Sequence, residues 1–183
     1  MNSRLQNLIK RYAELERTVQ ETVNEQCCTL CEHCTQVCCR ADICEEAIES
    51  PFLRLLNKRN ELDSDRYGFL HETGCALPVG RPPVCVEYFC DDQLYNQPDE
   101  THAKILRTLG ALVAHAGRNA IGDTHLVEIM QEDRLEHLAF QRLEKQLDES
   151  FQALEIIRTF YHEETLPDGS DRVLDRITFS EED

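Results

Sequence analysis

Residues 27–39 read CCTLCEHCTQVCC, and residues 74–90 read GCALPVGRPPVCVEYFC. All ten cysteines of the 183-residue chain lie between Cys27 and Cys90. Thiolate sulfur is a donor that zinc, iron and iron–sulfur clusters prefer. The two runs therefore predict a metal site made from two arms that are far apart in the sequence.

The spacing inside the arms favours metal ligands over ordinary core cysteines. Two residues separate Cys31 from Cys34, and such a short spacing lets the chain turn back so that both sulfurs point the same way. The predicted ligands are Cys31, Cys34, Cys38, Cys39, Cys75, Cys85 and Cys90. Three more cysteines, Cys27, Cys28 and Cys44, are left open between further ligands and small buried side chains.

Helical periodicity dominates the chain outside the arms, so we predict a mainly α fold with a helical bundle as its scaffold. Helices are predicted from Ser3 to about residue 24, after Asp42, from Ser50-Pro51, from Asp99 to Gly117, from Thr124 to Met130 and from Glu132 to about Glu163. Residues 25–41 show no competing apolar period and predict a loop with about one helical turn.

The stretch from Tyr67 to Pro98 is interrupted by several glycines and prolines and predicts irregular structure. Glu72-Thr73-Gly74 is typical of a tight turn between extended pieces at 68–70 and 75–77, which leaves room for one short β-hairpin. Core burial hardly orders a loop of this length, so we expect a metal tie to hold it.

The length fits a single domain over residues 1–183. Within it, residues 27–90 form a cysteine-rich metal-binding module. Residues 1–26 and 99–163 form the helical scaffold, and residues 180–183 form an acidic tail.

The charge balance limits the partners of the protein. The chain has 19 Lys and Arg against 35 Asp and Glu, a net charge of −16. An acidic surface repels phosphate backbones and anionic lipids, so we expect neither a nucleic acid nor a membrane as partner. The acidic helices from 99 to 163 are a candidate binding surface for a protein partner.

The N-terminal residues 1–20 carry six charged side chains, which excludes the apolar segment of a signal peptide. We therefore expect a cytoplasmic protein. Thiols stay reduced in that compartment, so we expect no disulfide framework.

The segments CEHCTQVCC at 31–39 and FLHETGCALPVGRPPVCVEYFC at 69–90 resemble the YkgJ-type cysteine-cluster family, whose members are also called zinc/iron-chelating domain proteins. The similarity is strongest at Phe69-Leu70, Gly74-Cys75 and Arg81-Pro82, and Cys85 and Cys90 follow as in that family. It covers about a third of the chain and implies a metal-chelating module.

The chain departs from the family pattern in two places. Three residues, rather than the commoner two, precede the Cys38–Cys39 pair. Many relatives have a cysteine just before the Phe-Leu pair, where this chain has Tyr67-Gly68.

We expect a metal-binding protein that holds zinc or iron, with an iron–sulfur cluster as one form, for structural, metal-handling or redox-sensing use. An interaction or adaptor protein with a purely structural zinc is one alternative. Another is an enzyme with a cysteine-ligated metal centre, such as a methylase-like activity on proteins, since a related cysteine arrangement occurs in the flagellin lysine methylase family. The sequence identifies no catalytic residue, and it lacks a glycine-rich phosphate loop, GxSxG and HExxH, so a non-enzymatic role is favoured.

Overall fold

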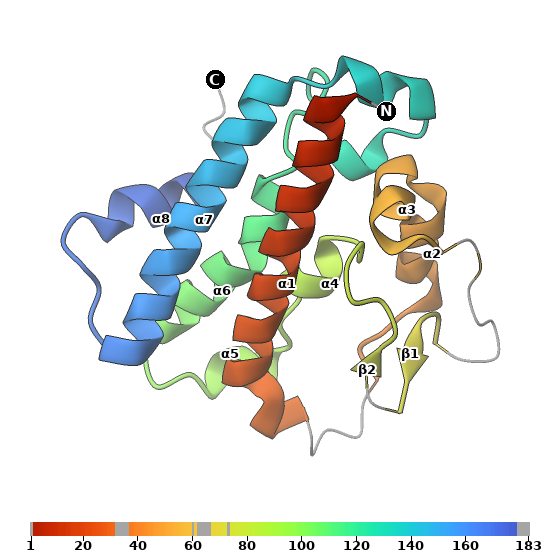
Figure 1. Cartoon of the computed structure of the whole chain (residues 1–183). Coiled ribbons are helices and arrows are strands. Elements are labelled where there is room, and N and C mark those ends of the chain that lie inside the picture. The colour runs from red at the N-terminus through yellow and green to blue at the C-terminus, as the bar shows by residue number, and fades with distance from the viewer. Residues whose placement is uncertain (1, 32–36, 60, 62–66, 73, 179–183) are drawn as a thin grey trace.

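The computed structural model describes residues 2–31, 37–59, 61, 67–72 and 74–178, with the backbone alone at 28–31. This part of the chain is mainly helical and carries one small antiparallel sheet. Three helices, α1 (Ser3–Cys31), α6 (Glu100–His115) and α7 (Phe140–Glu163), pack against one another as a scaffold (Figure 1). The predicted mainly α fold is confirmed.

The first helix is longer than predicted, because α1 continues past residue 24 to Cys31. The prediction of a loop over 25–41 is therefore wrong in its first part. Residues 24–31 contain neither glycine nor proline, so nothing in them stops a helix. Cys27 also continues the apolar stripe four residues after Val23, and it is only 5% exposed.

A pair of shorter helices, α2 (Ala41–Glu49) and α3 (Pro51–Asn57), packs together beside the scaffold. The start of α3 is as predicted, since the Ser50 hydroxyl accepts a hydrogen bond of 3.4 Å from the Leu53 N–H and Pro51 takes the first helical position. Asp42 lies in the first turn of α2, whose N-cap is Arg40.

The hairpin is present, with strands closer to the turn than predicted. β1 (Leu70–His71) pairs antiparallel with β2 (Gly74–Cys75), so that Leu70 lies opposite Cys75 and His71 opposite Gly74. The Ala76 N–H donates to the Phe69 carbonyl at 2.8 Å and extends the pairing by one residue. Thr73, in the turn, lies outside the described residues.

Two short helices lie in the stretch predicted to be irregular. α4 (Val84–Glu87) follows Pro82-Pro83, and α5 (Asp91–Tyr95) follows Cys90. Pro83 already has helical backbone angles, as its ring permits, and two acidic residues in the first turn suit the positive end of α5. Helices of four and five residues are too short to show a period in the sequence.

The second half of the chain confirms one predicted helix and corrects another. Asp99 caps α6 as predicted, since its carboxylate accepts from the His102 N–H at 2.9 Å. The helix predicted from Thr124 to Met130 is only a 3-10 turn at Leu126–Glu128. Thr124 forms an antiparallel bridge with Ile121 instead of capping a helix.

The long periodic stretch 132–163 is divided into a 3-10 helix at Glu132–His137 and α7. Between the two helices, the Ala139 N–H donates to the Ala120 carbonyl at 2.9 Å. This N–H therefore makes no hydrogen bond within a helix, and the helical pattern is interrupted at Ala139. A further helix, α8 (Ser170–Thr178), packs against α6 and α7. Residues 180–183, the predicted acidic tail, lie outside the described part.

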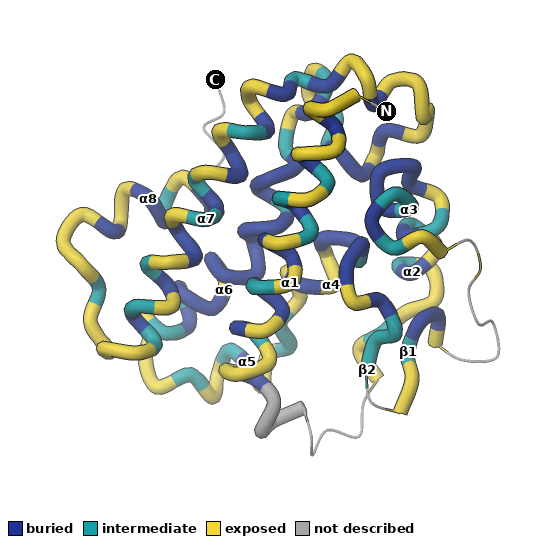
Figure 2. Tube along the Cα trace, in the orientation of Figure 1, coloured by how far each residue is buried: buried dark blue, intermediate teal, exposed yellow. Residues whose placement is uncertain are grey.

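The described residues bury two separate apolar clusters. The larger one joins α1, α3, α6, α7 and α8, and the dark segments of Figure 2 follow their inner faces. The smaller one lies in the cysteine-rich module and consists of Cys44, Ala47, Phe69 and Leu77. The module thus has a small core of its own at the edge of the helical scaffold.

None of the helices in the described ranges is both long enough and apolar enough to cross a lipid bilayer.

A candidate thiol centre

The small core of the module brings one cysteine from α2 to one from the hairpin. Cys44 is 8% exposed, and Cys75 packs against the cluster that contains it. Gly68 lies against the Cys44 side chain and takes a positive φ of 61°, which lets the chain turn tightly into the hairpin. The hairpin therefore places the start of the second arm beside α2.

The next cysteine, Cys85, lies on α4 and is positioned by close packing on α6. Gly110 of α6 has no side chain, and a Cβ there would fall 3.0 Å from the Val86 carbonyl and 2.7 Å from the Phe89 ring. Because glycine removes this obstacle, α4 rests directly on the backbone of α6. The Cys85 N–H donates to the Pro82 carbonyl at 2.9 Å, which anchors Cys85 to the turn before α4.

The electrostatics indicate that these thiols lie near enough to act on one another. Cys85 is exposed by surface area, yet the pKa of its thiol is raised to about 12. The main cause is that the surrounding protein displaces water from the thiol, and negative charge on Cys44, Cys75 and Cys39 contributes to the same shift. Burial also raises the pKa of Cys39, again with contributions from Cys75 and Cys44 and from the adjacent Cys38. The four cysteines Cys39, Cys44, Cys75 and Cys85 form one interacting group, which we call the thiol centre.

One cation, Arg81, acts on the thiol centre. Its positive charge lowers the pKa of both Cys39 and Cys85, although burial outweighs it. The Arg81 Nε–H donates to the Leu77 carbonyl at 2.8 Å, so the side chain lies back along its own loop.

A buried carboxylate of α1, which was not among the residues predicted from the sequence, holds the loop that carries Arg81. Glu16 is fully buried, and its two oxygens accept hydrogen bonds from the backbone N–H groups of Gly80 at 2.7 Å and Arg81 at 2.9 Å. Burial raises the pKa of Glu16, while these two hydrogen bonds lower it. A sequence signal exists, since Glu16 follows Tyr12 by four residues on the apolar face of α1.

The remaining predicted ligands lie elsewhere or outside the described side chains. Cys27 is part of the large scaffold core, where its carbonyl accepts from the Gln93 side chain at 3.3 Å. Cys38 is exposed next to Cys39, and Cys90 is the half-buried N-cap residue of α5. The side chains of Cys28, Cys31 and Cys34 are not among those described.

In the part of the chain that the structure describes, the thiols of Cys39, Cys44, Cys75, Cys85 and Cys90 are free. Among the described side chains, no three cysteine, histidine or acidic groups are arranged so that they could hold a metal ion as they stand. The centre is therefore a convergence of thiols from both predicted arms rather than a finished coordination sphere.

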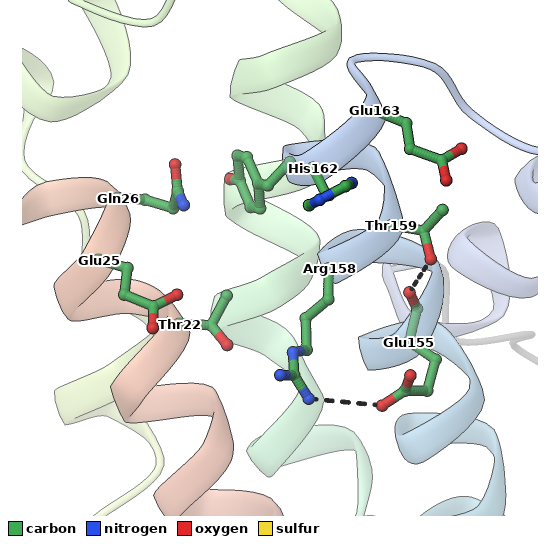
Figure 3. Close-up of a pocket in the computed structure, with 9 residues that line it drawn as sticks. Thr22, Glu25, Gln26, Glu155, Arg158, Thr159, His162 and Glu163 are labelled. Atoms are coloured by element: carbon green, nitrogen blue, oxygen red, sulfur yellow. Dashed lines mark hydrogen bonds and ion pairs between the residues drawn. The ribbon is translucent and has the colours of Figure 1, made fainter.

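A groove of about 540 Å³ lies apart from the thiol centre, between the C-terminal halves of α1 and α7. Figure 3 shows Glu25 and Gln26 of α1 on one side and Arg158 and His162 of α7 on the other. Arg158 pairs with Glu155 at 3.6 Å. The side chains that line the groove include no cysteine, so it is a feature of the scaffold.

Searches against family models, curated proteins and solved structures found no match for this chain. The similarity to the YkgJ-type family therefore stays a prediction from its motifs.

Proposed function

We propose that this protein binds a thiophilic metal, zinc or iron, through the thiol centre of Cys39, Cys44, Cys75 and Cys85. The observation that carries the proposal is that Cys44 and Cys75 meet in one small core, while Cys39 and Cys85 lie near enough to both for charge on these thiols to shift their pKa. Isolated buried cysteines need no partner, but four that share one site indicate a common ligand.

The donor set suits such a metal in kind and in number. Zinc in structural sites takes four ligands in a tetrahedron with Zn–S bonds of about 2.3 Å, and iron–sulfur clusters also use four thiolates. A bound metal supplies the positive charge that stabilises the four thiolates together. The cysteines must then move toward one another, with Arg81 offsetting part of the remaining negative charge.

The raised thiol pKa values disfavour a nucleophilic cysteine. Reactive cysteines have a lowered pKa, so that thiolate is present at neutral pH. Cys39 and Cys85 have the opposite shift, which keeps them protonated until a metal displaces the proton. This supports a metal-holding role over thiol-based catalysis or direct peroxide sensing.

The proposal is tested by metal analysis of protein purified without oxygen, together with a visible spectrum that separates colourless zinc from coloured iron–sulfur centres. We expect a metal in stoichiometric amount and its loss in the serine variants of Cys39, Cys44, Cys75 and Cys85. Cys27→Ser is the matched control, because Cys27 lies in the scaffold core. A wild-type protein that contains no metal and takes up neither zinc nor iron would overturn the proposal.

A further inference from the structure

We propose that Glu16 is a positioning residue that holds the second cysteine arm in place for metal binding, so that α1 sets the affinity of the thiol centre. The inference rests on the proposed function and assigns a role to a residue outside the cysteine-rich module. It begins from a carboxylate with no exposed surface in the middle of α1.

Two of the three hydrogen bonds that this carboxylate accepts come from the loop before α4. One oxygen accepts from the Gly80 N–H at 2.7 Å, and the other accepts from the Arg81 N–H at 2.9 Å and from the Gln20 side chain at 2.9 Å. A buried carboxylate is costly unless it is fully hydrogen-bonded, and a buried N–H is costly without an acceptor. Two consecutive N–H groups on one carboxylate also fix the orientation of the peptide between them.

The same loop is held from the other side by α3. The Asn57 side-chain amide donates to the Gly80 carbonyl at 3.1 Å and to the Ala47 carbonyl of α2 at 2.9 Å. Gly80 has a φ of +78°, and a Cβ there would fall 2.9 Å from the Leu53 carbonyl. Gly80 is thus fixed at its N–H by α1 and at its carbonyl by α3.

The Glu16 and Asn57 side chains together clamp the backbone of Gly80 and Arg81. The position of this clamp in the sequence connects it to the thiols. Gly80 and Arg81 lie between Cys75 and Cys85 in the sequence, and both cysteines belong to the thiol centre. Leu77, between Cys75 and the clamp, is buried in the core that contains Cys44. Fixing the middle of this segment restricts both flanking cysteines, and less conformational freedom is then lost when the metal binds.

The arrangement also shows which contacts of the protein itself order the loop. Burial, the Glu16 and Asn57 hydrogen bonds and the packing of α4 on Gly110 hold residues 77–89 on the scaffold. The expected metal tie is therefore not the only source of order in this stretch. The segment that carries Cys75 and Cys85 is thus held in place before a metal binds, and Cys39 and Cys44 supply the other two ligands.

The test compares Glu16→Gln with Glu14→Gln, an exposed position two residues away on the same helix. Glutamine has the shape of glutamate but only one accepting oxygen, so it cannot serve both loop N–H groups and Gln20. Zinc affinity is measured by competition with a chromophoric chelator, and helicity by circular dichroism. We expect Glu16→Gln to keep its helicity and one-to-one stoichiometry but to bind zinc about 10- to 100-fold more weakly, as for other residues that orient metal ligands. We expect Glu14→Gln to bind like the wild type.

Amide hydrogen exchange of the metal-free proteins provides a second measurement that does not depend on zinc. We expect the Gly80 and Arg81 amides to be protected in the wild type and in Glu14→Gln, and to exchange faster in Glu16→Gln. Equal zinc affinities of Glu16→Gln and wild type would overturn the role of Glu16 alone. A wild-type protein that binds no metal would instead overturn the proposed function, whatever the exchange data show.

Discussion

Gly68 lies directly over Cys44: a Cβ atom at residue 68 would fall 2.6 Å from the Cys44 Cβ and would overlap its sulfur. The hairpin that carries Cys75 can therefore approach α2 only because residue 68 has no side chain. The contact joins a buried thiol to the turn that leads into the second cysteine arm.

Gly68→Ala should destabilise the module and weaken metal binding. An alanine at a φ of +61° costs about 1–2 kcal/mol in backbone strain, and its overlap with Cys44 adds about 1–3 kcal/mol of overpacking. Chemical denaturation of the metal-free protein measures the loss of unfolding free energy. Gly122→Ala is the control, since Gly122 has a similar φ of +58° and nothing within 4 Å of the added Cβ. If the two variants lose the same stability, the contact with Cys44 contributes nothing.

Gly110→Ala should separate helix propensity from packing. Alanine normally stabilises a helix interior by about 1 kcal/mol relative to glycine. At residue 110 the added methyl group would meet the Phe89 ring and the backbone of α4, so we expect a net destabilisation and faster hydrogen exchange at Val86 and Glu87. Thr101→Ala, at an exposed position of α6, should have little effect. A more stable Gly110→Ala protein would contradict the close packing of α4 on α6.

Zinc affinity should rise with pH. Burial raises the pKa of Cys39 and Cys85, so both thiols are protonated in the metal-free protein at neutral pH, and binding must release these protons. Each released proton makes the apparent affinity about tenfold stronger per pH unit below the thiol pKa. Competition titrations between pH 6 and pH 8, with proton release measured by a pH indicator, test this expectation. A pH-independent affinity would show that these two thiols are not ligands.

Arg81→Gln should shift the same titration toward higher pH. Arg81 lowers the pKa of Cys39 and Cys85, so its loss makes the thiolates harder to form. We expect weaker zinc binding at pH 7 and a smaller difference at higher pH, where thiolates form more readily. The backbone hydrogen bonds of residue 81 remain, which separates the effect of charge from that of the Glu16 clamp.

Stability should fall below about pH 6.5 through His125. Its Nε2 lies 2.8 Å from the Ala114 carbonyl and its Nδ1 accepts from the Val127 N–H at 3.3 Å, so the ring is held neutral. Burial is the main cause that lowers the pKa of His125. The pKa of His125 is therefore lower in the folded state than in the unfolded state, where it is about 6.5. The free energy of unfolding is unaffected by this group above about pH 6.5 and decreases as the pH falls toward the folded-state pKa.

The measurement for this last prediction is the thermal midpoint between pH 5 and pH 8 for the wild type and for His125→Gln. The acid-induced decrease should be smaller in His125→Gln, while His137→Gln, at an exposed position, should follow the wild type. An identical decrease in all three proteins would assign the acid sensitivity to other groups.

Local features of the molecule were predictable from the sequence. The caps at Ser50 and Asp99 depend only on neighbouring residues, so these helix starts are where the sequence predicts them. The hairpin was also predictable, because glycine at Gly68 and Gly74 indicates the positive φ angles that its turns need. The short helices α4 and α5 were not, since they have too few residues to show a period.

The sequence by itself determined that thiols are concentrated in two arms, that most of the chain is helical and that the surface is acidic. Only the tertiary structure decided which thiols meet: it placed Cys44 in the centre and Cys27 in the scaffold core. It also decided that Glu16 of α1 supports a loop 64 residues further along the chain. The physical reason is that spacing and periodicity report on neighbours within a few turns of chain. The meeting of distant groups depends instead on how helices pack, here through Gly68, Gly80 and Gly110.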